Sequence, residues 1–208
     1  MRVAIADSFA ALLDGPLSTT ALIVVDMPIG LPEFPGRACE REVRRAIGPR
    51  RSSVFSSPLR GMLEFDDYPI ANAYGKARGA GLSKQVWAIT KKIREIDALV
   101  SPALQSRVIE GHPELAFTRL GGAPCNHPKR DAEGKRERIE LLKANDVDAT
   151  ALLSAHRATH PRKSVFADDD LIDACALALT AEAMTADKAW RLGDGSRDAR
   201  GLLMEICG

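Results

Sequence analysis

The feature that most constrains the fold is a short run of apolar, mostly β-branched residues, ALIVV at 21–25, which ends abruptly at Asp26. A run without alternating polar positions is typical of a strand that is buried on both faces. Further strands are predicted at residues 107–110 and 2–6. Because helical patterns separate these strands, the sequence predicts an α/β fold with a mostly parallel sheet.

Helices are predicted where apolar residues recur at helical spacing between Pro, Gly and capping residues. They cover residues 9–14, 37–47, 82–96, a segment from 131 onward and 168–186. A chain of 208 residues, 45% of them hydrophobic and 27% charged, suits one domain with a buried core. We therefore expect a single domain over 1–208, with a helical insertion at about 36–105.

Composition excludes several classes of protein. The 29 basic and 28 acidic residues leave a net charge of +1, so any binding to nucleic acid must be local. The four cysteines are widely spaced and form no CxxC pair, which argues against a disulfide framework and a zinc knuckle. We see no membrane span and no signal peptide, which favours a cytoplasmic location.

Carboxylates form the strongest candidate site. Asp26 and Glu110 follow the two predicted strands, and Asp170 and Asp173 lie one turn apart at the start of the last helix. Strand ends and helix starts meet at one edge of a parallel sheet, where carboxylate oxygens suit Mg²⁺ or Mn²⁺. We predict all four residues to be catalytic, with metal held by Asp26, Asp170 and Asp173.

Structural explanations compete with this prediction. Acidic residues in the first turn of a helix also stabilise the helix dipole, so the run DDDLID at 168–173 has an ordinary use. Glu110, His112 and Glu114 would share one side of an extended segment, but Pro113 suggests a turn that breaks the pattern. Asp26 is harder to explain as a cap, because it follows a strand and precedes Met-Pro.

Basic residues cluster between the predicted strands. The cluster, followed by two serines, is predicted to grip the phosphates of DNA or RNA. Its members are Arg37, Arg41, Arg44, Arg45, Arg50 and Arg51. Glu40 and Glu42 are interleaved, so an ordinary solvated helix surface is the alternative.

Several motifs in order carry a family resemblance. They are DMPIGLPE at 26–33, GRACEREVRRAIGPRRSSVF at 36–55, GLSKQVWAITKKIREID at 81–97, IEGHPELAF at 109–117 and DDLIDACALALTAE at 169–182. Together they resemble the family numbered 429 among the domains of unknown function, whose members are predicted metal-dependent nucleases. The resemblance implies a ribonuclease-H-like fold: a five-stranded mixed sheet with flanking helices, carrying acids on its first and fourth strands and its last helix.

One departure from that family matters for function. Its members begin with a strand ending in a glycine-flanked aspartate, and here Asp7 is the only substitute, better explained as a helix cap. We therefore expect the first one or two strands to be missing. Two hypotheses remain: a metal-dependent, nuclease-like phosphodiester hydrolase, inactive in this form if the first acid is essential, and a non-catalytic module that binds nucleic acid or protein.

Overall fold

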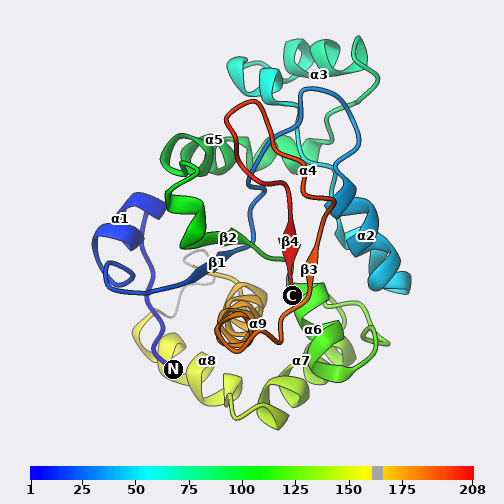
Figure 1. The fold of residues 1–208 in the computed structure, drawn as a ribbon. Helices are drawn as coiled ribbons and strands as arrows, with labels where there is room; N and C mark the ends of the chain where they lie inside the picture. The colour runs from blue at the N-terminus through cyan, green and yellow to red at the C-terminus, as the bar shows by residue number, and fades with distance from the viewer. Residues whose placement is uncertain (161–165) are drawn as a thin grey trace.

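Two short parallel strands lie at the centre of the molecule (Figure 1). In the computed structural model, which describes residues 1–160 and 166–208, β1 (Ile23–Val25) pairs with β2 (Val108–Glu110). Ile23 lies opposite Val108 and Val25 opposite Glu110, so both strands end at the same level. The expected α/β fold and the parallel pairing are confirmed, and Asp26 and Glu110 reach the same edge.

The sheet is smaller than the family resemblance implies. In the part of the chain that the structure describes, the strands form two two-stranded sheets and not one five-stranded sheet. The second pairs β3 (Arg191–Leu192) with β4 (Ile206–Cys207), and a parallel bridge from Gly111 to Cys207 links the two. The strand predicted at residues 2–6 is wrong, because this mostly exposed segment pairs with no described strand.

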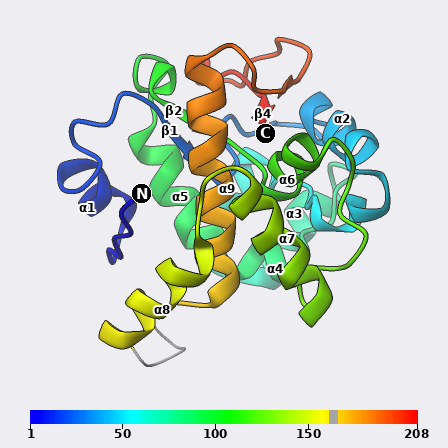
Figure 2. The ribbon, with the colours of Figure 1, turned by 90° about the horizontal axis from the view of Figure 1, so that it is seen from below.

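Helices surround the strands on two sides. One group comprises α1 (Phe9–Asp14), α2 (Ala38–Ala46), α3 (Tyr68–Lys76), α4 (Lys84–Ala88) and α5 (Thr90–Leu99), with the 3₁₀ turns η1 (Gly48–Ser53), η2 (Arg60–Glu64) and η3 (Leu104–Ser106). The other comprises α6 (Pro113–Gly121), α7 (Ala132–Ala144), α8 (Ala149–Thr159) and α9 (Asp168–Thr185). Figure 2 shows α9 running through the middle of this second group.

The cores follow this division. Leu171 and Ala176 of α9 pack with Phe117 of α6 and Leu142 of α7 in one apolar cluster. The segment expected to be an insertion contributes a second cluster around Met62 and Ile93. This segment is not separate from the rest, because α5 also packs against the residues of β1 and β2. Among the described residues, no helix is long and apolar enough to cross a membrane.

The helix expected at 82–96 is interrupted. Ile89 separates α4 from α5, with φ −103° and ψ 4° outside the helical range. The carbonyl of Val86 accepts from the Ile89 amide at 3.1 Å and from the Thr90 hydroxyl at 3.1 Å. Periodicity alone does not reveal such a break, because the apolar residues keep nearly the same spacing across it. The break turns Ile89 toward the pocket described below.

Candidate functional site

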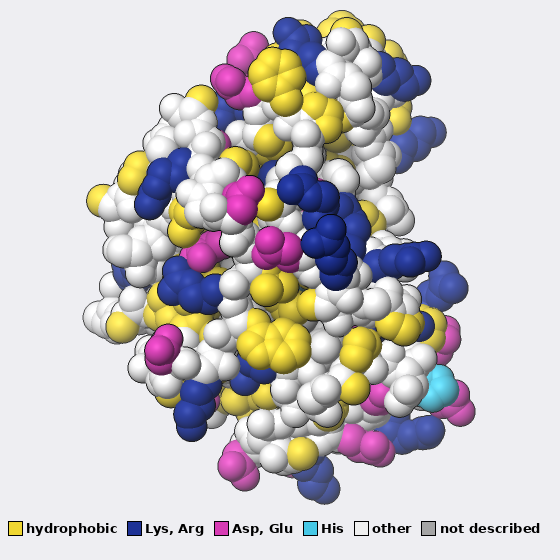
Figure 3. Space-filling model, turned by 45° about the vertical axis from the view of Figure 1, so that its right-hand side comes forward, with side chains coloured by type: hydrophobic (Ala, Val, Ile, Leu, Met, Phe, Trp, Pro, Cys, Tyr) yellow, Lys and Arg dark blue, Asp and Glu magenta, His cyan; other side chains and the backbone are white. Residues whose placement is uncertain are grey.

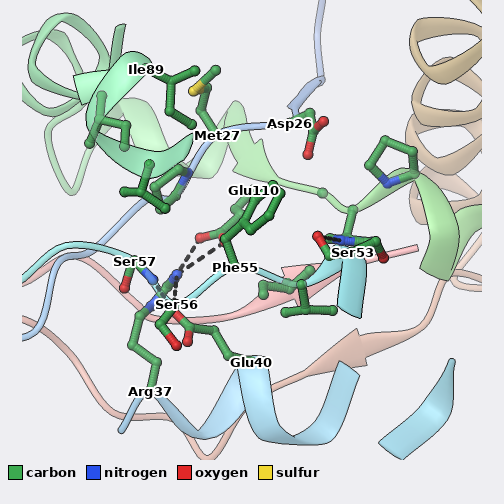
Figure 4. Close-up of a pocket in the computed structure, with 18 of the residues that line it drawn as sticks. Asp26, Met27, Arg37, Glu40, Ser53, Phe55, Ser56, Ser57, Ile89 and Glu110 are labelled. Atoms are coloured by element: carbon green, nitrogen blue, oxygen red, sulfur yellow. Dashed lines mark hydrogen bonds and ion pairs between the residues drawn. The ribbon is translucent and has the colours of Figure 1, made fainter. Parts of the chain in front are cut away.

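A pocket of about 380 Å³ opens where β1 and β2 end. Asp26 and Met27 line it after β1, and Glu110 to Glu114 line it after β2 and at the start of α6. The segment 53–58 forms another wall, and apolar side chains of α4 and α5 close the inner end. Figure 4 shows Asp26 pointing into this space, with Met27 and Ile89 beside it and Ser53 across from them.

Asp26 is open to solvent at the pocket, but protein surrounds it on its other sides. Its pKa is raised to about 7, first by loss of water around the carboxyl group and then by the charge of nearby Asp173, against which Lys129 acts. Glu110 and Asp170 add smaller repulsions. Asp26, Asp170 and Asp173 therefore lie close enough to interact electrostatically.

Lys129 connects the pocket to α9. It lines the pocket, and its ammonium donates to Asp173 Oδ2 at 2.8 Å. Burial raises the pKa of Asp173, whereas Lys129 lowers it, and Asp173 Oδ1 is buried without a partner among the described residues. Asp170 accepts the backbone N–H of Ala167 at 3.0 Å, a helix-capping contact. Within the described residues, no three His, Cys, Asp or Glu side chains form a preassembled metal-binding group.

Glu110 has a different surrounding from the one expected of a metal ligand. Two nitrogens of Arg37 donate to its two oxygens at 3.1 and 2.5 Å, and the amide of Ile29 donates at 2.7 Å. Burial opposes the charge on both partners, but the facing Glu110 carboxylate raises the pKa of Arg37 above its ordinary value. Glu110 and Arg37 thus form a buried ion pair, which leaves Arg37 no surface to offer to a phosphate.

His112 and Glu114, which were expected to share one side of an extended segment with Glu110, also line the pocket. His112 lines it, and burial lowers the pKa of its imidazole to about 4. Its Nε2 lies 3.4 Å from the Ser53 carbonyl oxygen, and its buried Nδ1 has no partner among the described residues. Arg138 holds Glu114: its Nη2 donates to both carboxylate oxygens at 2.6 and 2.7 Å, and its Nε donates to Oε1 at 3.0 Å. Pro113 begins α6 after His112, and the three side chains still line one pocket.

The predicted arginine cluster divides into buried and exposed members. Arg44 donates to the Val54 carbonyl at 3.1 Å and to Ser56 Oγ at 3.0 Å, so it braces the pocket wall. Arg50 is partly buried, whereas Arg41, Arg45 and Arg51 are exposed. Figure 3 shows basic side chains gathered near the middle of one face, with acidic and apolar ones around them. Only the exposed members are available to a nucleic acid.

Sequence reasoning missed two parts of this pocket. Lys129 has no distinguishing sequence pattern, because it lies in a run rich in basic residues, yet the structure brings it to Asp173 and to the pocket. The Phe55 ring, 48% exposed, lies in the middle of Figure 4. The run SSVF, followed by SSP, was a usable signal for a wall of small polar residues around one aromatic.

The comparisons with known proteins identify a family. The sequence matches the family described as Protein of unknown function (DUF429) over residues 1–197. The chain belongs to this family. The match includes Asp26, all of α9 and the pocket-lining residues other than Ile206, so these are parts of the DUF429 domain. No curated protein and no solved structure matches the chain.

Proposed function

We propose that this DUF429 protein is a ribonuclease-H-like, metal-dependent phosphodiester hydrolase whose reaction takes place between Asp26 and the first turns of α9. The observation that carries the proposal is that Asp26, which lines the pocket after β1, lies within electrostatic reach of Asp170 and Asp173 of α9, with Lys129 joining the pocket to Asp173. Phosphodiester hydrolysis with metals needs several carboxylates that meet at one edge of the fold.

The carboxylates of Asp26, Asp170 and Asp173 suit a hard divalent cation such as Mg²⁺ or Mn²⁺ as ligands. Carboxylate oxygens are the ligands these ions take, and the buried Asp173 Oδ1 lacks a partner within the described part of the chain. Burial is the main cause of the raised pKa of Asp26, and the charge of Asp173 adds to it; a bound cation would offset both. When bound, the metal supplies Lewis-acid activation of the phosphate and of a water molecule.

The remaining pocket residues have roles that do not depend on the metal. The ammonium of Lys129 lies near Asp26 and donates to Asp173. There it can contact a phosphate oxygen, or a cation can displace it from Asp173. Glu110, fixed by Arg37, holds the amide of Ile29 and thereby the loop after β1. We therefore assign Glu110 to positioning this loop and not to catalysis.

Metal-dependent melting tests the proposal. We expect excess MnCl₂ to raise the melting temperature of the wild-type protein, since a ligand at a hundred times its Kd adds about 2.7 kcal/mol to the stability. Asp26→Asn and Asp173→Asn should lose this shift, whereas Asp14→Asn, a change at an exposed carboxylate on α1, should retain it. Manganese-dependent cleavage of structured DNA and RNA should follow the same pattern. An equal shift in all four proteins, or none in any, contradicts the metal site.

A non-catalytic binding module is the second candidate. It is favoured by the two ion pairs that already neutralise acids at the site, Arg37 with Glu110 and Lys129 with Asp173. This candidate predicts a salt-sensitive complex with nucleic acid and no turnover with either metal. The cleavage assay therefore separates the two.

A further inference from the structure

The pocket is chemically divided along its length. Its outer end carries the charged groups Asp26 and Lys129, next to the proposed reaction site. Its inner end is apolar, lined by Val86 of α4, Ile93 of α5 and Ile89 between the two helices. A ligand that fits both ends needs an anionic group joined to a flat or compact apolar body.

Phe55 adds an aromatic surface to this division. It lines the pocket and is 48% exposed, although large apolar side chains in the pocket wall such as Val54 and Ile93 are buried. In Figure 4 its ring lies between the Met27 and Ile89 side and the Ser53 side. An exposed aromatic ring beside a phosphate-binding group is the arrangement on which unpaired bases stack.

Polar atoms without partners line the same space. Ser57 Oγ and His112 Nδ1 are buried, belong to pocket-lining residues, and have no hydrogen-bond partner among the described residues. A nucleobase has an apolar face and polar edges, so it can use the apolar walls and these polar atoms together. A volume of about 380 Å³ is at the lower end of the range for small-ligand sites and is not a groove for a duplex.

We infer that the pocket holds one unpaired nucleobase of a single-stranded nucleic acid, with its ring against Phe55 and its phosphate toward Lys129. The inference rests on the proposed phosphodiester hydrolysis and narrows it to unpaired nucleotides. Base pairing would hide the polar edges and hold the base in the stack, so a duplex must first release the base.

Fluorescence anisotropy with three probes tests this inference in EDTA, where no metal-dependent cleavage occurs. The probes are a fluorescein-labelled oligothymidylate, its abasic analogue and its duplex with oligoadenylate. We expect the single strand to bind about ten-fold more tightly than the other two, as one base–aromatic stack supplies. Equal binding of the three probes, or no binding of any, overturns the inference.

Matched variants locate the contact. Phe55→Leu keeps an apolar side chain but removes the ring, and should weaken binding of the single strand about ten-fold, whereas Phe55→Trp should restore it. Phe34→Leu is the control, because Phe34 is 69% exposed and does not line the pocket. Equal losses for Phe34→Leu and Phe55→Leu, or full binding by Phe55→Leu, contradict a stacking role.

The outcomes separate this inference from the proposed function. Single-strand binding that depends on Phe55, without cleavage in Mn²⁺, would support the base pocket and reject hydrolysis. Cleavage that depends on Asp26 but treats duplex and single strand alike, and is unchanged in Phe55→Leu, would support hydrolysis and reject the base pocket.

Discussion

At the scale of single residues, two buried arginines of this protein each form an ion pair with a buried glutamate. Arg37 with Glu110 and Arg138 with Glu114 each bring a guanidinium and a carboxylate into the interior, with side chains at most 8% exposed. Removing one member of such a pair leaves the other charged and without water. These pairs give the pocket walls a fixed geometry.

The Glu110 pair gives a stability prediction. Glu110→Gln leaves the Arg37 charge buried without its counter-ion, so the free energy of unfolding should fall by about 3–5 kcal/mol in urea titrations. Asp66→Asn is the control, because Asp66 is 93% exposed in its ion pair with Arg94, and should cost less than about 1 kcal/mol. Similar losses in both variants would show that burial of the Glu110 pair has little effect on stability.

His112 gives a pH prediction. Its folded pKa of about 4 lies below the ordinary 6.5, so folding favours the neutral ring. The stability it contributes is present above pH 6.5 and is lost as the pH falls toward 4, by on the order of 3 kcal/mol. Asp26 has the opposite effect. Its pKa in the folded protein is raised to about 7, so its contribution to the free energy of unfolding increases as the pH falls below 7.

The difference between two proteins isolates the histidine. Unfolding free energies of the wild type and His112→Gln, measured between pH 7 and 4, should diverge as the pH falls, with the wild type losing more. His127→Gln, at an exposed ring, serves as the control for loss of an imidazole. Parallel curves for the wild type and His112→Gln would contradict a buried neutral His112.

The helices and strands of the fold differ in how well the sequence predicts them. The runs that became β1, β2 and α9 have strong patterns, and each was expected within two residues of its bounds. Strands β3 and β4 have two residues each, too few for any periodicity, and only pairing with each other defines them. The expected strand at 2–6 had the pattern but pairs with no strand in the part of the chain that the structure describes.

Helix α7 carries a constraint that determines where Lys129 lies. A Cβ at Gly134 would come within 1.9 Å of the Pro128 carbonyl oxygen, so only glycine lets the preceding loop pass this close. Arg138 also holds this loop, donating to the His127 carbonyl at 3.1 Å. The position of Lys129 at the pocket therefore depends on a residue without a side chain.

Gly134→Ala should consequently be destabilising, although alanine favours helices by about 1 kcal/mol over glycine. We expect a loss of about 1–3 kcal/mol, as for other overpacked sites, together with weaker metal-dependent activity. Thermal melting and the cleavage assay measure both. Glu140→Ala on the same helix is the control and should leave both unchanged, and a stabilised Gly134→Ala would contradict the close approach.

At the scale of the whole molecule, the candidate site combines segments that lie far apart in the sequence. Asp26, Glu110 and α9 could be brought together by reasoning about strand ends, because parallel strands end at one edge. The composition of residues 52–58 could suggest a polar wall, but neither that wall nor Lys129 could be placed next to the strand ends, because a loop leaves no periodic pattern. The roles of Asp170 and Glu110 were open from sequence for a related reason: a carboxylate can cap a helix, pair with arginine or bind metal.

Strand β1 has β2 on one side and, among the described residues, no strand on the other. A second, mostly apolar groove lies between residues of this strand region, Leu17 and 20–24, and side chains of α9. An open strand edge is a template for fibril growth when it is long and flat. Here it is three residues long and flanked by a helix, so an incoming strand would gain few backbone hydrogen bonds. The shortness of β1 thus limits aggregation through its unpaired edge.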